Sequence, residues 1–291
     1  MAALLKFITV LHCRIGLKPP QASRVRIDPA ILLCQMLKSL DRYLGRGSYY
    51  WLKDHIHPDR EYTQLTYARM VAGVLTPQTR WLDAGGGHQI FEVAIPEMER
   101  EMVAKVKLVV CCDLELDHIA KHRSIRLGVG ATLDRLPFRT QSLDLITLNS
   151  VAEHLERPRE VLEEFARVLA PGGRVIIHTP NVASYAVRIA EVGRRILPKP
   201  LIMKLIRYMD FRGEEDVFPT FYRINTRPDL EAASRQAGLL VENFQLVLAR
   251  PIFYFIAPLC AAQLAADRMM MRMGADSFAA SVIIAMLRKP L

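Results

Sequence analysis

The chain has 291 residues, of which 51% are hydrophobic and 24% are charged, and its formal net charge is +9. These values exclude a disordered chain and allow one elaborated domain or two small ones. The positive charge favours an anionic partner, namely nucleic acid, a membrane surface or an acidic substrate, without choosing among them.

Cysteine usage and hydropathy limit the class of protein further. The five cysteines are scattered, with no CxxC pair and no His/Cys cluster of zinc spacing, so we interpret them as reduced thiols and expect no metal site. The apolar start is broken by Lys6 and lacks a small-residue cleavage site, which argues against a signal peptide. The longest uncharged run, 251–266, is shorter than the roughly 20 residues of a membrane-spanning helix. We therefore expect a cytoplasmic protein.

Helical patterns occupy the first part of the chain. Asp28 and Pro29 are typical of a helix start, and apolar residues follow at helical spacing as far as Gly45. A second helix is predicted over residues 59–74. We interpret residues 1–78 as a helical lead-in to the main domain.

From Arg80 onward, short apolar runs alternate with helical patterns. The predicted strands cover residues 80–84, 106–113, 142–149 and 174–180. Before the fourth strand, an apolar helical stripe runs from Val161 to Leu169 and is closed by Gly172. Strands that alternate with helices predict βαβ units and a parallel sheet, which we assign to residues 79–180.

This alternation stops after residue 180. Residues 181–226 are rich in Arg and Lys and are predicted to form a basic, partly helical insertion over the acceptor site. A helix that ends at Gly238 then resumes the core, and strands are predicted within 239–248 and 277–290 with an apolar helix between them. Residues 227–291 thus complete the domain.

Three consecutive glycines, Gly85 to Gly87, follow the first predicted strand, where open parallel sheets bind ligands. The dinucleotide fingerprint GxGxxG fails because position 90 is Ile90. A phosphate-binding P-loop fails because His88 and Gln89 stand where Lys and Ser/Thr are required. The remaining interpretations are a nucleoside cofactor bound without a pyrophosphate, or a plain turn.

Several blocks then stand in order over residues 80–181: "WLDAGGG", "VVCCD", "DRLPFRTQSLDLITLNSVAEHLERP" and "EEFARVLAPGGRVIIHTPN". Together they resemble the class I S-adenosylmethionine-dependent methyltransferases with a type 11-like domain, especially those of quinone and glycan pathways. The resemblance is close over these residues and loose elsewhere. It implies an α/β fold, a Rossmann-like three-layer sandwich with a mostly parallel seven-stranded sheet and an antiparallel last strand, plus N-terminal helices and a helical insertion.

The same resemblance implies S-adenosyl-L-methionine as the cofactor and places its parts on the chain. The glycines would approach the carboxylate beside the N-terminus of the next helix, Asp83 would hold the loop and attract the ammonium, and Asp113 would bind the ribose hydroxyls. The implied cofactor-binding residues are Asp83, Gly85, Gly86, Gly87, Asp113, Leu114, Thr132, Leu133 and Asn149. Gln89 departs from the family where the third glycine usually lies, and Thr132 departs where an acid often meets the adenine.

Methyl transfer from a sulfonium is a direct displacement, so the enzyme mainly aligns the nucleophile and excludes water. A general base is needed only when the nucleophile is a neutral hydroxyl, and His154 is then the candidate, with a hydrogen-bonded histidine at a helix start as the alternative. The residues expected at the acceptor are Glu153, Asp216, Tyr222 and Arg223.

The basic insertion and the late apolar helix favour an amphipathic or anionic acceptor: a small molecule, a glycan or a lipid-linked intermediate, with O-methylation favoured. Two other classes stay open, a non-catalytic S-adenosylmethionine-binding module and a nucleic-acid methyltransferase. "LNSVAEH" replaces the NPPY-type tetrad of the latter, and we expect no nucleic-acid partner. The late helix, with Phe253 to Leu259, either packs against the two late strands and the rim of the acceptor pocket or makes peripheral contact with a membrane. The sequence does not define an oligomeric state.

Overall fold

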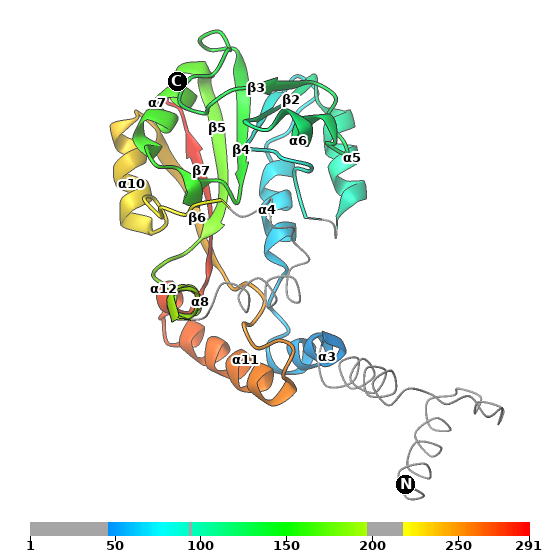
Figure 1. Ribbon diagram of the computed structural model, residues 1–291, viewed down its shortest axis with the longest axis vertical. Helices are drawn as coiled ribbons and strands as arrows, with labels where there is room; N and C mark the ends of the chain where they lie inside the picture. Colours follow the sequence, from blue (N-terminus) through cyan, green and yellow to red (C-terminus); the bar gives the residue numbers. More distant parts are fainter. Residues whose placement is uncertain (1–45, 93–94, 197–217) are drawn as a thin grey trace, which may run out of the picture.

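The computed structural model describes residues 46–92, 95–196 and 218–291. Seven strands form one sheet in the order β3-β2-β1-β4-β5-β7-β6 (Figure 1). Their bounds are β1 Arg80–Ala84, β2 Leu108–Asp113, β3 Gly128–Gly130, β4 Leu143–Asn149, β5 Leu169–Pro180, β6 Leu240–Val247 and β7 Val282–Arg288. The first five strands pair in parallel, and β7 runs antiparallel to both β5 and β6. The predicted mostly parallel sheet with an antiparallel last strand is confirmed.

Helices cover both faces of this sheet, which makes three layers. The helices are α3 Arg46–Ile56, α4 Thr63–Ala72, α5 Pro96–Lys105, α6 Leu116–Ala120, α7 Pro158–Val168, α8 Tyr185–Ile196, α10 Arg227–Gln236, α11 Ala257–Arg272 and α12 Asp276–Ala279, with a 3-10 turn at Ala152–His154. Helices α4 and α5 lie on one face and α7 and α10 on the other, while α3, α8, α11 and α12 form a separate group at one end (Figure 1).

The alternation of side chains along β1 divides the core between the two faces. Trp81 packs into a cluster with Tyr67 of α4 and Met102 of α5, whereas Leu82 packs with Phe165 of α7 and with α10. Successive residues of a strand point to opposite faces, so one short strand supplies both clusters. Complete burial of each such side chain contributes about 1.5–3 kcal/mol.

Several element boundaries differ from the sequence-based prediction. The helix predicted over 59–74 begins at Thr63, because residues 58–59 form a turn closed by a hydrogen bond from Arg60 N to His57 O. Leu169, predicted in the helical stripe, is the first residue of β5 and pairs with Leu143. Strand β3 and helices α3, α5 and α6 were not predicted. The helix predicted from Asp28 lies outside the described residues, and the proposed segment boundaries stay a prediction.

The late apolar helix, α11, packs against α3. Tyr254, just before α11, is 2% exposed and clusters with Tyr49 of α3 and with Cys260 and Leu264 of α11. The helix is therefore packed on the protein, but mainly against α3 and not, as the first alternative had it, against the two late strands. In the described residues, no helix combines the length and the hydropathy needed to span a bilayer.

A buried ion pair ties this helical group to the sheet. Arg60, which precedes α4, places Nη1 2.7 Å from Oδ2 of Asp267 in α11, and both side chains are at most 3% exposed. Asp267 also accepts a 2.5 Å hydrogen bond from the Tyr185 hydroxyl of α8, and Arg60 Nη2 donates to the carbonyl of Ala249 after β6. One guanidinium and one carboxylate therefore connect α8, α11, the segment before α4 and the segment after β6.

We expect Asp267→Asn to lower the free energy of unfolding by about 3–5 kcal/mol, because it leaves the Arg60 charge buried without a counter-charge. Urea unfolding measures this loss. The matched control is Glu61→Gln, which breaks an exposed pair with Arg69 and should cost about 0–1 kcal/mol. Equal losses in the two variants would contradict the role given to the buried pair.

Candidate active site

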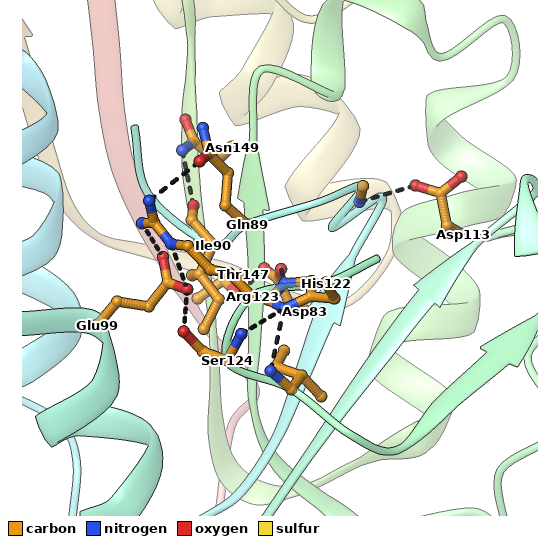
Figure 2. A network of polar contacts seen from close by, with 12 residues as sticks. Asp83, Gln89, Ile90, Glu99, Asp113, His122, Arg123, Ser124, Thr147 and Asn149 are labelled. Atoms are coloured by element: carbon orange, nitrogen blue, oxygen red, sulfur yellow. Dashed lines mark hydrogen bonds and ion pairs between the residues drawn. The ribbon is translucent and has the colours of Figure 1, made fainter. Parts of the chain in front are cut away.

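The glycine turn fastens the end of β1 to the end of β2. Gly85 N donates to the carbonyl of Cys112 at 2.7 Å, and Gly86 N lies 3.4 Å from the same oxygen. Gly87 N donates to Oδ2 of Asp113 at 3.0 Å, the contact drawn to Asp113 in Figure 2. The turn thus lies beyond the carboxyl ends of two adjacent parallel strands, where ligands bind in such sheets.

The three glycines are required for different reasons. A Cβ at Gly85 would lie 2.6 Å from Cγ2 of Val151, and one at Gly86 would lie 2.3 Å from Oδ2 of Asp83. At Gly87 a Cβ would meet nothing within 4 Å, but φ is +52°, which disfavours any other residue. Neighbouring protein atoms therefore exclude a side chain at Gly85 and at Gly86. At Gly87 the backbone conformation requires glycine, and the space above the turn is open.

The next helix does not begin at the glycines, which corrects the expectation that its N-terminus lies beside them. Helix α5 starts at Pro96. Ile90 and Phe91 lie between and are fully buried in the α4–α5 cluster. The chain directly after the glycines is thus occupied by core residues. Helix α5 begins nine residues after Gly87, so its N-terminus is not the group that follows the glycine turn.

Asp113 and Leu114 stand together at the end of β2. Asp113 is half-buried; its Oδ1 accepts from Glu115 N at 3.0 Å and its Oδ2 accepts from Gly87 N. Each carboxylate oxygen has a second lone pair, so both can still accept from ribose hydroxyls. Leu114 is 68% exposed and offers an apolar surface beside them.

The turn after β3 holds the two residues expected near the adenine. Thr132 is exposed and its carbonyl accepts from Arg135 N, while Leu133 is half-buried and packs against the α7 cluster. Asp134, the acid two positions beyond Thr132, is ion-paired with Arg157 at 3.2 Å. Its carboxylate is therefore already bound to a cation of the protein.

Asn149, at the end of β4, connects α4 to the loop after the glycines. Its carboxamide exchanges two 2.9 Å hydrogen bonds with that of Gln64, and its Nδ2 also donates to the carbonyl of Ile90 at 2.8 Å. Both ends of the Asn149 side chain are thus engaged with the protein. Gln64 was not singled out from the sequence, because a single glutamine on a helix carries no local signal.

Asp83 lies beneath the turn and is 1% exposed. Its Oδ1 accepts from Thr147 Oγ1 at 2.8 Å, and Thr147 Oγ1 accepts in turn from Trp81 Nε1 at 2.7 Å. Burial raises the pKa of Asp83 to about 7 against the opposing effect of the Thr147 hydrogen bond, and the nearby charges of Glu99 and Asp113 raise it further. Gly86 covers the carboxylate, so Asp83 supports the turn from below.

His122 approaches Asp83 from the segment after α6. Its Nδ1 accepts from the backbone N–H groups of Ser124 and Ile125 at 3.2 and 3.0 Å, so the ring proton is on Nε2, which lies 4.0 Å from Oδ2 of Asp83. Burial lowers the pKa of His122 to about 4. The Sγ of Cys111 completes a cluster within 4.8 Å, but a protonated Nε2 has no lone pair for a metal ion.

On the acceptor side, Glu153 has a structural role. Its Oε2 accepts from Thr179 Oγ1 at 2.8 Å, and its carbonyl accepts from the N–H groups of Phe221 and Tyr222 at 2.8 and 3.1 Å. The side chain is 5% exposed. Glu153 therefore holds the segment that returns to the core before α10.

His154 is oriented by that same segment. Its Nδ1 lies 2.7 Å from the carbonyl of Pro219, and because a carbonyl can only accept, Nδ1 carries the proton. The lone pair of the neutral imidazole is then on Nε2. The ring also packs edge-on against Phe218, with centroids 6.0 Å apart.

The other residues expected at the acceptor do not converge. The Tyr222 hydroxyl donates to Glu191 of α8 at 3.1 Å, and Tyr222 has a positive φ of 53°. Arg223 instead lines a cavity of about 470 Å³ with Arg157 and with residues at the start of α7. The backbone turn at Tyr222 sends consecutive side chains toward different helices. Asp216 lies outside the described residues.

Comparison with known proteins agrees with this geometry. Residues 82–177 match the family described as a methyltransferase domain. A demethylmenaquinone methyltransferase of Corynebacterium efficiens is 30% identical over 43% of this chain and 53% of its own length. A ubiquinone biosynthesis O-methyltransferase of Xanthomonas axonopodis pv. citri is 25% identical over 73% of this chain and 84% of its own length.

A solved structure shares the fold. It is the Haloferax volcanii methyltransferase in complex with the Trm112 methyltransferase activator, with a TM-score of 0.52 and 15% identity over 84% of this chain and 97% of that one. The chain spans about half the length of the first curated relatives that it matches, 42% and 53%. The matched domain, residues 82–177, contains the glycine turn, β2 and β4.

Asp83 should make stability depend on pH. An unfolded aspartate ionises near pH 4, whereas folded Asp83 keeps its proton to about pH 7, so the folded state binds more protons between these values. The contribution of Asp83 to stability is therefore lost as pH rises from about 4 to about 7, by at most about 1.4 kcal/mol per pH unit, and the loss levels off above pH 7.

The neutral variant Asp83→Asn isolates this effect, because His122 remains in both proteins. Urea unfolding should show that the wild type loses about 2 kcal/mol relative to Asp83→Asn between pH 5 and pH 7. Parallel pH profiles for the two proteins would show that Asp83 is ionised throughout, against this prediction.

Proposed function

We propose that this chain, a class I S-adenosylmethionine-dependent methyltransferase by its domain and fold, transfers a methyl group to a hydroxyl of a small-molecule or lipid-linked acceptor. The observation that carries the proposal is the glycine turn hydrogen-bonded to Asp113 at the ends of β1 and β2. The matched family and the curated methyltransferases support methyl transfer as the chemistry.

S-adenosyl-L-methionine is the cofactor of this family, and the residues present fit it. Open space above Gly87 accommodates the amino-acid tail, the unused lone pairs of Asp113 suit the ribose hydroxyls, and the exposed face of Leu114 suits a flat base. The cofactor supplies an electrophilic methyl group on a sulfonium. The protein supplies position and exclusion of water.

O-methylation is favoured because His154 is prepared as a base. The carbonyl of Pro219 fixes its tautomer and leaves Nε2 free to accept the proton of an acceptor hydroxyl. One relative is named a ubiquinone biosynthesis O-methyltransferase, which supports transfer to an oxygen, and another is named a demethylmenaquinone methyltransferase; the two names together support a quinone-type acceptor. We do not include nucleic acid among the acceptors.

Replacement of Asp113 should weaken cofactor binding. In Asp113→Ala the ribose loses charge-assisted hydrogen bonds worth about 1.5–3 kcal/mol, so the Kd for S-adenosylhomocysteine should rise about ten-fold or more. Titration calorimetry measures this value. The control is Asp117→Ala on the exposed side of α6, which should bind as the wild type does; an unchanged Kd in Asp113→Ala would remove the ribose assignment.

Replacement of His154 should slow turnover without affecting cofactor affinity. His154→Gln can still donate to the Pro219 carbonyl but cannot take up a proton, so methylation of soluble catechols and other phenols should fall about 10²–10⁴-fold. The control is His55→Gln, an exposed histidine bonded to Trp51 O. Normal turnover in His154→Gln would leave alignment alone as the source of catalysis.

A further inference from the structure

The loop after the glycines departs from the family motif at Gln89. The half-buried Gln89 continues the turn, with its N–H donating to Gly86 O at 3.1 Å. Its side-chain Oε1 accepts a 3.1 Å hydrogen bond from Nη1 of Arg123. The side chain that replaces the third glycine is therefore held by an arginine from another part of the chain.

Arg123 lies between α6 and β3 and binds three residues of this loop. Its backbone N–H donates to His88 O at 3.0 Å, its Nη1 donates to Gln89, and its Nη2 donates to Phe91 O at 2.9 Å. Figure 2 shows Arg123 between Gln89 and Glu99. One residue thus fixes the backbone at both ends of the segment 88–91.

Glu99 of α5 holds the guanidinium from the other side. It is fully buried, it accepts from Arg123 Nε at 3.0 Å and forms an ion pair with Nη2. It also accepts from Phe91 N at 3.0 Å and from Ser124 Oγ at 2.5 Å. Burial alone would raise the pKa of Glu99, but these hydrogen bonds hold it below its usual value, so the carboxylate stays charged.

All three nitrogens of the guanidinium are used in this arrangement. Nε faces Glu99, Nη1 faces Gln89, and Nη2 bridges Glu99 and the Phe91 carbonyl. A planar fork of five donors can make these contacts at once, whereas the single ammonium of a lysine cannot. The contacts are therefore specific to arginine rather than to a positive charge.

We propose that Arg123 is a positioning residue for the cofactor: acting through Gln89, His88 and Phe91, it fixes the loop that a third glycine would otherwise shape. The inference rests on the proposed function. In that binding mode the glycine turn faces the amino-acid tail of the cofactor, and Asp113 faces the nucleoside. Loss of the Arg123 fork should therefore weaken binding of the tail and spare the nucleoside.

The test compares Arg123→Lys with Arg80→Lys. Arg80 is a matched control because it also makes a two-pronged ion pair with an acid, Asp144, but at the first residue of β1, away from the turn. Calorimetry gives the Kd of each variant for S-adenosylhomocysteine, and competition gives the Kd for 5′-methylthioadenosine, which lacks the amino-acid tail. Urea unfolding gives the stability of each protein.

For Arg123→Lys we expect about a ten-fold weaker affinity for S-adenosylhomocysteine, the effect of one lost charge-assisted hydrogen bond, and an affinity for 5′-methylthioadenosine within about two-fold of the wild type. Arg80→Lys should lower stability and change neither affinity. A general loss of structure cannot give this pattern, since it would weaken both ligands.

A second variant keeps the test decisive if Arg123→Lys folds poorly. Gln89→Ala retains the Arg123–Glu99 pair and the Arg123 contact to the Phe91 carbonyl and removes only the contact between the Gln89 and Arg123 side chains, so it should weaken binding of S-adenosylhomocysteine selectively. In the Arg123→Lys background the same change should add little, because the contact between the side chains of residues 89 and 123 is already lost there.

Equal weakening of both ligands by Arg123→Lys, unchanged affinity, or the same effect from Arg80→Lys would overturn the inference. Failure of the wild type to bind S-adenosylhomocysteine would overturn the proposed function and the inference with it. A wild type that binds and an Arg123→Lys variant that binds equally well would remove the inference alone.

Discussion

The hydrogen bonds from the glycine N–H groups to Cys112 and Asp113 are the constraint on which the site depends. They join the ends of two parallel strands, and they require the chain to turn without side chains where Val151 and Asp83 press against it. Asp83 supports this turn from below, and Asn149 and Arg123 limit the path that the chain takes after it.

Polar groups support the glycine turn from the side of the sheet, although the core around them is apolar. Trp81, Thr147 and Asp83 form a chain of hydrogen bonds through the centre of the sheet, and His122 faces its end. A buried carboxyl group is costly unless it is paired or neutral, and its elevated pKa provides the second solution. The arrangement holds Gly86 in contact with a group that has little freedom to move.

The sequence predicted the strands well because burial on both faces leaves continuous apolar runs, as in β2 and β4. It also singled out the glycines, which follow the first predicted strand, and Asp113, which ends the second, because both stand at the carboxyl ends of strands. It did not predict the roles of Arg123, Glu99 and Gln64, because one polar residue on a helix or loop carries no signal of the partner that it meets in the folded chain. Strand β3, with the sequence Gly-Val-Gly, is too short to leave a pattern.

The strand order has a consequence for synthesis of the chain. β6 joins the sheet through β7, which is made later and inserts between β5 and β6. During synthesis, the edge of β5 that will pair with β7 therefore stays unpaired while more than a hundred further residues, β6 and α11 among them, are translated. At about 5–20 residues per second this exposure lasts several seconds, and an open edge is a template for association with other chains. Nascent chains released before β7 should thus be the species that chaperones capture.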